Sequence, residues 1–396
     1  MLELIFVLSV FMVFYAYFGY PLLLLLLVNT KRRISSGVLA SFNPTVTIVI
    51  AARNEEQVIA EKLENTLGLL WGEGKTVESA PELQVIVASD CSEDKTDSIV
   101  RLHAARKVEL VRATERRGKE HVQALAVDAS RGDILVFTDA KTTLRSDALK
   151  NLVKYFADPG IGAISSLDEV DFGAGIGEGA YVRYEMWVRE LESSFYSLVG
   201  LSGSCFAVRR NLCRDFRRDI PSDFSVLLSV VKNGFRGVLA GDVLCSYKST
   251  TNPAEEFRRK VRTILRGMTT LHSCKEVLNV FVYGAFSWQV FSHKLCRWLV
   301  PFFVILAAFC LLILSFSSMF YMSILMFSLG TLLLAAGGYF SEHLRKEMFC
   351  KIPLFFIISN LAILVAAWHF ALGKRSIMWT PSLRMFALAL LATIFP

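Results

Sequence analysis

Polar side chains suited to ligand binding follow three short apolar runs of this 396-residue chain. They are Asn54 and Glu55 after the first run, Asp90 after the second, and Asp139 after a later one. Each of them alone is more typical of a turn or a helix cap, because Asp and Asn favour helix N-termini. Together with the Gly118-Lys119 turn, whose flexible backbone and ammonium suit phosphate oxygens, they indicate a pocket for a phosphate-bearing ligand such as a nucleotide sugar.

The apolar runs before these side chains are rich in β-branched residues and alternate with helix-like segments. They cover Val46 to Ile50, Leu83 to Ala88, Val108 to Val111 and Ile134 to Thr138. This alternation is typical of a parallel sheet with helices on both faces, so we expect an α/β fold. Ligand sites of such sheets lie at the carboxyl ends of the strands, where the acidic side chains stand.

The composition indicates that this domain belongs to a membrane protein, because the chain is 53% hydrophobic and holds 30 Phe. An almost uncharged segment, Leu2 to Val28, is long enough to cross a hydrocarbon core of roughly 30 Å. The segment is too long for the core of a signal peptide, and the basic cluster Lys31-Arg32-Arg33 follows it, so we expect a retained anchor. The positive-inside rule then places the N-terminus outside and the next domain in the cytoplasm.

Three apolar segments near the C-terminus are also expected to span the membrane. They are about Leu299 to Phe316, Ser318 to Tyr339 and Pro353 to Leu372. The segment Val277 to Phe291 is shorter and interrupted, so we expect it to be interfacial or re-entrant. Three crossings from the cytosol leave Lys374-Arg375 outside, against the positive-inside rule. Either the loop with Lys374-Arg375 is an exception to the rule, or Val277 to Phe291 is a further membrane crossing. The sequence leaves both alternatives open.

Five stretches of the chain carry a family resemblance when they are read in order. They are IVIAARNEE from Ile48, ASDCSEDKT from Ala88, RRGKEHVQALAVDASRGDILVFTDAKTTL from Arg116, LSGSCFAVRR from Leu201 and FRRKVRTILRG from Phe257. In this order they resemble the family 2 inverting glycosyltransferases with a GT-A fold. The likeness extends to SHKLCRWLVPFF from Ser292, as in membrane-integrated bacterial exopolysaccharide synthases and cellulose- or hyaluronan-synthase-like enzymes.

The resemblance implies an α/β, GT-A (Rossmann-like) cytosolic domain inserted between one N-terminal and about three C-terminal transmembrane helices. Four regions follow along the chain. They are a transmembrane anchor at 1–30, a GT-A glycosyltransferase domain at 45–250, amphipathic interfacial helices at 251–298 and a C-terminal transmembrane region at 299–396.

The resemblance also implies which residues bind a nucleotide-sugar donor. Asp90 would accept a hydrogen bond from the nucleobase, for which the imide N–H of uracil is suited. Lys119 would meet the diphosphate, although without the family context it could equally be a solvated surface lysine. The other implied donor-binding positions are Ala52, Asn54 and Glu55 beside the base and ribose, Gly203 where the backbone approaches the donor, and also Lys141 and Arg259.

The motif at Asp139 departs from the family pattern. Family members usually carry Asp-x-Asp, whose carboxylates hold Mg²⁺ or Mn²⁺ against the diphosphate. This chain has Asp139-Ala140-Lys141, and a protonated lysine cannot ligate a hard cation. Two interpretations stay open. Asp139 binds the metal together with phosphate oxygens and water, or the Lys141 ammonium replaces part of the charge of the metal.

An inverting transfer needs a base that deprotonates the acceptor hydroxyl. The resemblance assigns this role to Asp223 at the start of an expected helix, where the family has an acidic pair and Ser222 replaces the first acid. Ser222 or Asp223 could also cap that helix, since Pro221 precedes them. Asp219 is the second candidate for the base.

A basic stretch, Arg259-Lys260-Val261-Arg262-Thr263, stands where processive synthases show QxxRW. Arg262 matches the motif arginine and would stabilise the charge that develops on the diphosphate. Thr263 replaces the tryptophan of the motif, which weakens the case for long-chain polymerisation. The other basic residues of this segment fit attraction to anionic lipid headgroups, namely Arg258, Lys260 and Arg266.

These features predict a multi-pass glycosyltransferase of the bacterial inner membrane. It would transfer a sugar from a nucleotide sugar, by preference a UDP-sugar, to a lipid-linked or polysaccharide acceptor with inversion. One alternative is a processive exopolysaccharide synthase that extrudes its product. Another is a catalytically silent subunit of a synthase complex, which the departures at Lys141, Ser222 and Thr263 favour. The formal charge of +7 does not indicate a nucleic-acid partner, because many basic residues lie beside membrane segments.

Overall fold

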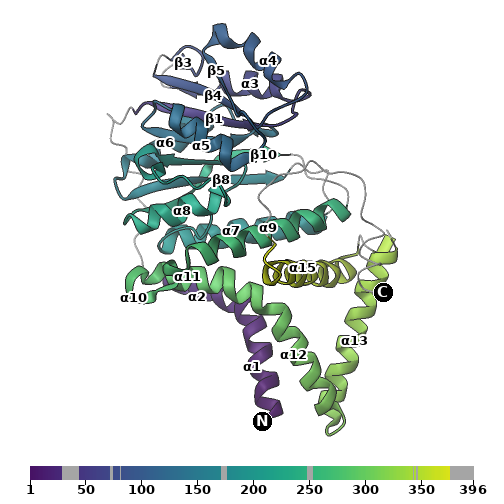
Figure 1. Cartoon of the computed structure of the whole chain (residues 1–396). Coiled ribbons are helices and arrows are strands. Elements are labelled where there is room, and N and C mark those ends of the chain that lie inside the picture. The colour runs from purple at the N-terminus through teal and green to yellow at the C-terminus, as the bar shows by residue number, and fades with distance from the viewer. Residues whose placement is uncertain are drawn as a thin grey trace.

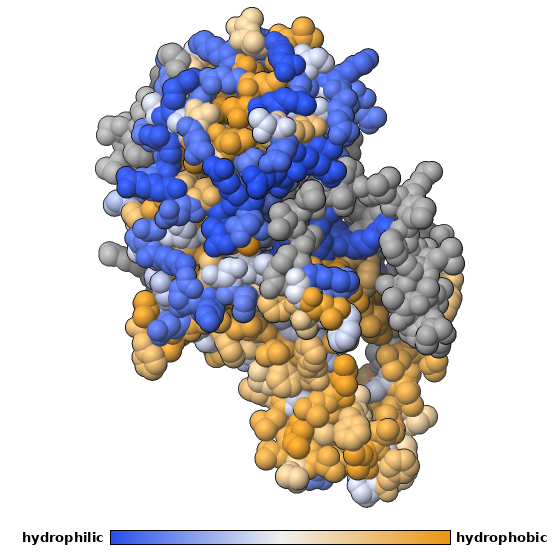
Figure 2. All heavy atoms as spheres, in the orientation of Figure 1, coloured by the Kyte–Doolittle hydropathy of each residue, from blue (hydrophilic) through white to orange (hydrophobic). Residues whose placement is uncertain are grey.

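The computed structural model of the chain describes residues 1–28, 44–71, 75–80, 82–170, 176–247, 253–341, 343–344 and 347–374. One part is a sheet domain with helices packed around it, and the other is a group of long apolar helices (Figure 1). The surface changes accordingly, from largely hydrophilic around the sheet domain to hydrophobic around the long helices (Figure 2).

The central sheet has eight strands in the order β5-β4-β1-β6-β9-β8-β10-β7. They are β1 (Val46–Ala52), β4 (Leu83–Ser89), β5 (Val108–Arg112), β6 (Ile134–Asp139), β7 (Thr142–Leu144), β8 (Ile161–Val170), β9 (Cys205–Arg209) and β10 (Arg236–Tyr247), with β2 (Leu70–Trp71) and β3 (Lys75–Thr76) as a separate pair. The first four strands of the order are parallel, as predicted. The other half is mixed, because β9 runs antiparallel to both β6 and β8.

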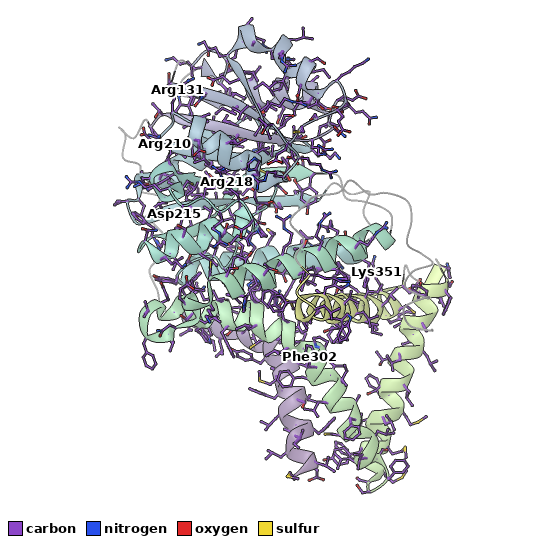
Figure 3. The ribbon with its side chains drawn as sticks, viewed as in Figure 1. Arg131, Arg210, Asp215, Arg218, Phe302 and Lys351 are labelled. Carbon is purple, nitrogen blue, oxygen red and sulfur yellow. The ribbon has the colours of Figure 1, made fainter. Side chains whose placement is uncertain are left out.

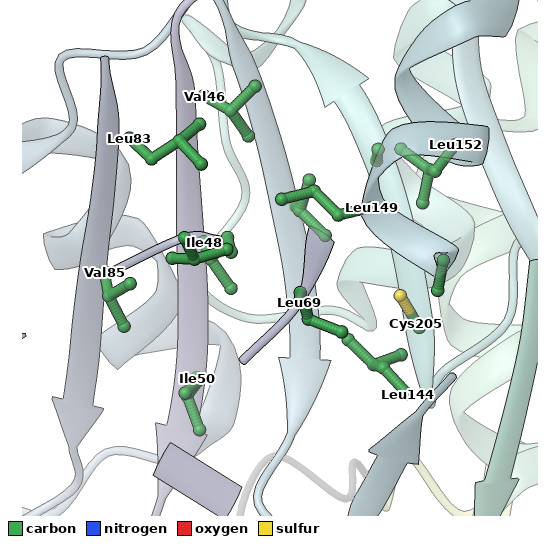
Figure 4. Packing of buried hydrophobic residues seen from close by; sticks show 14 of the residues in the cluster. Val46, Ile48, Ile50, Leu69, Leu83, Val85, Leu144, Leu149, Leu152 and Cys205 are labelled. Atoms are coloured by element: carbon green, nitrogen blue, oxygen red, sulfur yellow. The ribbon is translucent and has the colours of Figure 1, made fainter. Parts of the chain in front are cut away.

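Helices cover both faces of the sheet because successive strand residues point to opposite sides. Ile48 and Ile50 of β1 pack in a core with α3 (Ile59–Leu67) and α6 (Ala148–Lys154). Figure 4 shows part of this core, with Leu149 and Leu152 of α6. Val49 points the other way, into a core with α5 (Lys119–Ala129) and α8 (Ser222–Lys232). The remaining helices of this domain are α4 (Thr96–Leu102), α7 (Ile176–Phe195), α9 (Pro253–Ser273) and single turns at Ala104–Arg106, Tyr155–Ala157, Arg210–Cys213 and Lys275–Leu278.

Four helical stretches within the described residues are long and apolar enough to cross a membrane. The first joins α1 (Leu2–Phe14), a π-helical turn (Tyr15–Gly19) and α2 (Tyr20–Val28). The second joins α11 (Ala285–Val290), a π-helical turn (Phe291–Cys296) and α12 (Arg297–Ser315). The others are α13 (Met319–Phe340) and α15 (Met348–Ala371). Figure 1 shows α1, α12 and α13 extending away from the sheet domain, whereas α15 runs across their direction beneath α9.

The second stretch begins earlier than predicted. The sequence predicted a span from Leu299 and a separate segment from Val277 to Phe291, but the chain is helical without a break from Ala285 onward. Only the short helix α10 (Val280–Tyr283) is separate. Gly284 follows it with a φ of +52°, a left-handed conformation that glycine adopts without strain, and this turn separates α10 from α11.

A buried polar cluster joins the first two apolar stretches to α7. Tyr20 Oη donates a hydrogen bond to Glu192 Oε1 at 2.6 Å, and His293 Nδ1 lies 2.6 Å from the same oxygen. Arg297, at the start of α12, forms an ion pair with Glu185 of α7. Buried charges are stable only when they are paired, so this cluster specifies how the sheet domain sits on the apolar helices.

Candidate active site at the carboxyl ends of the strands

The turns that follow β1 and β4 are fastened to each other by Arg53. Its Nη1 donates to the carbonyl oxygens of Asp90 at 2.5 Å and Cys91 at 3.0 Å. Asn54 and Cys91 both have left-handed backbones, with φ of +51° and +53°. The Asn54 side chain accepts a hydrogen bond from the Glu93 N–H at 2.9 Å. The two strand ends therefore form one connected edge, and the Asn54 side chain serves the turn itself.

Asp90 holds the Gly118-Lys119 turn through its carboxylate. The side chain is buried, Oδ1 accepts from the Arg117 N–H at 2.9 Å, and Oδ2 accepts from the Gly118 N–H at 3.0 Å. The Asp90 N–H in turn donates to the Ala52 carbonyl at 3.0 Å. Gly118 has a φ of +99°, where a residue with a side chain would be strained. The contact of Asp90 with a nucleobase stays a prediction, whereas its shaping of the turn is seen directly.

Lys119, the first residue of α5, bridges two parts of the site. Its Nζ lies 2.5 Å from Asp139 Oδ1 at the end of β6 and 3.1 Å from the Gly203 carbonyl oxygen. Burial alone would lower the pKa of Lys119, but the negative charges of Asp139, Glu120 and Asp223 outweigh it and raise this pKa. The ammonium is therefore charged at neutral pH and sits directly on the leading acid of the Asp139 motif.

Lys141, which stands in place of the second acid of the motif, reaches Glu55 at the end of β1. Its Nζ lies 3.3 Å from Glu55 Oε2, and its side chain is 63% exposed. Burial raises the pKa of Glu55, and the charge of Lys141 opposes that shift. Lys141 and Lys119 thus place one lysine against each of the two acids at these strand ends.

The loop before β9 brings Gly203 against Asp223 in the first turn of α8. A Cβ placed on Gly203 would lie 3.4 Å from Asp223 Oδ2. The Leu201 N–H donates to the Asp223 carbonyl oxygen at 3.1 Å, which ties this loop to the helix. Because the Gly203 carbonyl also accepts from Lys119, the loop connects Asp223 to the ammonium that holds Asp139.

The contacts of Ser222 and Asp219 bear on two alternatives left by the sequence. Neither Ser222 nor Asp223 caps α8 through its side chain, so the capping interpretation is wrong. Ser222 Oγ instead donates to Gln123 Oε1 at 2.8 Å and fastens α8 to α5. The carboxylate of Asp219 accepts two hydrogen bonds from Arg217 at 2.8 and 2.7 Å, and these lower the pKa of Asp219. A lowered pKa makes the Asp219 carboxylate a weaker base than an ordinary aspartate, and the assignment of the base to Asp223 stays a prediction.

An ion pair between Arg266 and Glu120, both largely buried, ties α9 to the start of α5. Glu120 follows Lys119, so the pair brings α9 beside the Gly118-Lys119 turn. Arg262 lies one helical turn before Arg266. Burial lowers the pKa of Arg262, and the neighbouring charges of Arg266 and Arg259 lower it further. Within the described part of the chain the Arg262 guanidinium has no hydrogen-bond or ion-pair partner, so it is available to an anionic ligand.

Arg259, which the sequence predicted to bind the donor, lies one turn earlier still on α9. Its Nε is 2.6 Å from Glu256 Oε2, three residues before it on the same helix. The side chain of Arg259 is 46% exposed, compared with 16% for Arg266. Any contact of Arg259 with a donor therefore stays a prediction, since its observed ion pair is within α9.

Sequence reasoning missed the acid Asp168 near the end of β8. Ser202 Oγ lies 2.7 Å from both carboxylate oxygens of Asp168, and Ser166 Oγ donates to Oδ1 at 3.1 Å. Burial raises the pKa of Asp168, Arg189 opposes the shift, and Asp139 adds to it. Asp168 therefore belongs to the same electrostatic neighbourhood as Asp139. Its position on the antiparallel side of the sheet, which the sequence did not show, is the reason that it was missed.

Sequence reasoning also missed Lys62, a buried lysine behind the Asp139 motif. Its Nζ donates to Thr138 Oγ1 at 3.0 Å and to the Thr142 carbonyl at 2.6 Å, so it supports both ends of the turn between β6 and β7. Burial lowers the pKa of Lys62 to about 8. The available signal was a lysine on the apolar face of the α3 segment, between Ile59 and Leu63.

The side chains alone do not form a metal cage. Within the described residues no group of three or more His, Cys, Asp and Glu side chains could hold a metal ion. Asp139 offers one carboxylate, and Lys119 is already in contact with it. A divalent cation fits here only if phosphate oxygens and water complete its shell, a coordination that Mg²⁺ accepts.

Comparison with curated proteins gives partial matches. The chain is 32% identical over 128 residues to the succinoglycan biosynthesis protein ExoO of Rhizobium meliloti (strain 1021), covering 32% of this chain and 34% of that protein. It is 24% identical over 222 residues to an N-acetylglucosaminyltransferase of Rhizobium sp. (strain N33), covering 51% and 48%. The matches thus span between a third and a half of the length of these relatives.

Comparison with solved structures covers more of the chain. The mannosyltransferase PcManGT from Pyrobaculum calidifontis, solved in complex with GDP-Man and Mn²⁺, is 22% identical, with a TM-score of 0.74 over 95% of this chain and 100% of that one. This likeness shows a shared fold. Residues 47–217 match the model of glycosyl transferase family 2. The chain therefore carries a family 2 glycosyltransferase domain with a GT-A fold, placed between an apolar N-terminal helix and three apolar C-terminal helices.

Proposed function

We propose that the protein is a membrane-bound inverting transferase that moves a sugar from a nucleotide sugar to a hydroxyl of a lipid-linked or glycan acceptor. The observation that carries this proposal is the Lys119 bridge. One ammonium contacts Asp139 and the carbonyl of Gly203, and Gly203 lies against Asp223. A group suited to phosphate and a carboxylate suited to act as a base are thus brought into one site.

In the proposed reaction the acceptor oxygen attacks the anomeric carbon while the bond to the diphosphate breaks. Asp223 takes the proton of the acceptor hydroxyl, and the electron pair of the broken bond stays with the diphosphate. Lys119 and Arg262 stabilise the charge that develops on this leaving group. The Arg262 guanidinium has no partner among the residues that the structure describes, which supports the assignment.

The donor is proposed to be a UDP-sugar that is bound at the ends of β1 and β4. The side chain of Asp90 would accept from the uracil imide N–H, and Glu55 and the backbone at Ala52 would line the ribose. A carboxylate can equally accept from the N–H groups of guanine. The donor test therefore includes both UDP- and GDP-sugars.

A divalent cation, Mg²⁺ or Mn²⁺, is proposed to bind at Asp139 with phosphate oxygens as its other ligands. Once bound it would neutralise part of the charge of the diphosphate. The Mn²⁺ in the solved PcManGT complex supports this choice. Lys141 pairs with Glu55 and leaves Asp139 as the acid of the motif.

The test is nucleotide release by the full-length protein in detergent, with UDP- and GDP-sugars as donors and bacterial lipid extract as the acceptor. We expect release with at least one donor and a loss of about 10²-fold or more in Asp223→Asn, because general-base catalysis contributes about 10²–10⁴-fold. Asp219→Asn is the matched control, since the carboxylate of Asp219 is engaged by Arg217. It should retain activity.

Omission of metal separates the two interpretations of the Asp139 motif. Loss of release in EDTA, restored by Mn²⁺, would support the one-carboxylate site. Release that EDTA leaves unchanged would contradict the metal proposal and leave the lysines as the source of positive charge. Nucleotide binding without release from any donor would contradict the transferase proposal and favour a silent subunit.

A further inference from the structure

The helix α15 follows a different course from the other long apolar helices. Its length and its mean hydropathy of 2.1 fit a membrane span. The chain nevertheless returns along α13 towards the sheet domain and then enters α15, which runs sideways beneath α9 (Figure 1). Lys351, near the start of α15, lies closer to the level of α9 than Phe302 of α12 does (Figure 3).

Contacts between α9 and α15 continue along both helices. Lys260 Nζ lies 3.9 Å from the centroid of the Phe355 ring, and the rings of His272 and Phe370 are 5.7 Å apart. Between these contacts, Val261 and Leu265 of α9 are buried with Ala362 and Ala366 of α15. At about 1.5 Å per residue the stretch from Lys260 to His272 is about 18 Å long, and over this length the two helices run in the same direction.

The charges of α9 fix the depth at which both helices lie. The helix carries Arg258, Arg259, Arg262 and Arg266, and the last of these is paired with Glu120 of the sheet domain. Arginines are costly at the centre of a bilayer, so α9 stays at the membrane surface. Because α15 remains alongside α9 for several turns, it stays at the same depth.

A close helix crossing turns the chain sideways at the end of α13. A Cβ placed on Gly338 would lie 3.3 Å from Cys350 Cβ in the first turn of α15. Small residues at such a point let two helix backbones approach closely. Exposed side chains of α15 are apolar at both ends of the helix, with Met348, Ile352 and Trp368 more than half exposed.

We propose that α15 is not a span but lies in the plane of the membrane, on the side of the sheet domain, with its exposed apolar side chains against lipid. Three stretches then cross the membrane: Leu2–Val28, Ala285–Ser315 and Met319–Phe340. The exposed apolar side chains of α15 would then lie at the boundary between headgroups and acyl chains. In this arrangement α15 lies between α9 and the bilayer.

The distribution of basic residues supports three crossings in the whole chain, one N-terminal and two C-terminal. On the far side lie the N-terminal end with Glu3 and the turn Phe316-Ser317-Ser318, and neither sequence contains a lysine or arginine. The basic residues outside the spans then fall on the side of the sheet domain, including Lys31-Arg32-Arg33 and Lys374-Arg375. This arrangement satisfies the positive-inside rule, which three C-terminal spans would violate.

Labelling of single cysteines with a membrane-impermeant maleimide tests the proposal without any need for activity. The full-length variants are Ser317→Cys for the far side, His343→Cys for the domain side and Ser376→Cys beyond α15. Seven of the eight native cysteines are buried and Cys91 is partly exposed, so the unmodified protein gives the background. Each variant is labelled in spheroplasts and in inside-out vesicles.

We expect Ser376→Cys to behave like His343→Cys and to be labelled only in inside-out vesicles. Labelling of Ser376→Cys in spheroplasts, together with Ser317→Cys, would overturn the proposal, because α15 would then cross the membrane. Fusion of alkaline phosphatase or green fluorescent protein after Pro396 is a second measurement of the side of the membrane on which the segment after α15 lies. An active phosphatase would also overturn it, whereas a fluorescent fusion supports it.

Discussion

Lys119 is the residue whose charge acts on most of the proposed site, since it contacts Asp139 and Gly203 together. We expect Lys119→Ala to lower kcat for nucleotide release by about 10²–10³-fold, the loss typical of one donor aimed at developing negative charge. Steady-state kinetics of release measure this effect. Lys150→Ala is the control, because Lys150 is an exposed lysine of α6. Wild-type kinetics in Lys119→Ala would remove Lys119 from the mechanism.

Lys62 gives a prediction about pH and stability. Burial lowers its pKa from 10.5 to about 8 in the folded chain. Between these two values the unfolded chain binds the additional proton, so the free energy of unfolding rises with pH by up to about 1.4 kcal/mol per pH unit. Below about pH 8 both states are charged, and the penalty for burying this charge is fully present.

The comparison of wild type with Lys62→Met isolates this contribution, because the other titrating groups are common to both. We expect the melting temperature of the wild type to rise relative to that of Lys62→Met between about pH 8 and pH 10. Thermal unfolding in detergent measures the difference. A gap that stays constant over this range would show that Lys62 does not titrate as its burial implies.

At the scale of elements, the ion pair between Arg266 and Glu120 couples α9 to α5. Removal of one partner of a buried pair costs about 3–5 kcal/mol, because the other charge is left buried and unpaired. We therefore expect Arg266→Met to lower the melting temperature clearly, and Arg266→Met with Glu120→Gln to recover part of the loss. Arg258→Met, at an exposed position of α9, should change little. Additive losses in the double variant would contradict this coupling.

The parallel half of the sheet was predictable because each of its strands is a β-branched run that ends in a polar turn. The residues at Asn54, Asp90 and Asp139 could be placed together for the same reason. The strand β9 could not be oriented, because an apolar alternation looks the same in parallel and antiparallel pairs. Asp168 and Lys62 were missed for related reasons, since their neighbours come from distant strands and turns.

At the scale of the whole molecule, the polar cluster of Tyr20, Glu192 and His293 ties the N-terminal helix to the sheet domain. We expect a chain that lacks residues 1–28 to be less stable in detergent than the full-length chain, because Glu192 loses the hydroxyl of Tyr20 and the residues packed against the N-terminal helix are uncovered. Size-exclusion chromatography of the shortened and full-length proteins measures aggregation. A monodisperse, folded short form would show that the cluster is dispensable.

The predicted membrane segments show what hydropathy can and cannot give. It correctly marks α13 and α15 as long apolar helices, since their length and composition are local properties. The direction of α15 depends on its contacts with α9 and on the crossing at Gly338. Neither of these is visible in a hydropathy pattern. The uninterrupted helix from Ala285 was missed because its first turns contain polar residues that the sheet domain covers, such as Gln289 and His293.

The carboxylate of Asp90 limits how the donor preference of this protein can be engineered. Both of its oxygens already support the backbone of the Arg117-Gly118 turn, which leads directly into Lys119. A substitution at Asp90 that is meant to exchange one nucleobase for another would therefore also release the loop that presents the Lys119 ammonium, which we propose binds phosphate. In the proposed site, selection of the nucleobase and binding of the phosphate would both depend on the Asp90 carboxylate. Variants with a new donor are therefore better sought among the neighbours of Asp90 than at Asp90 itself.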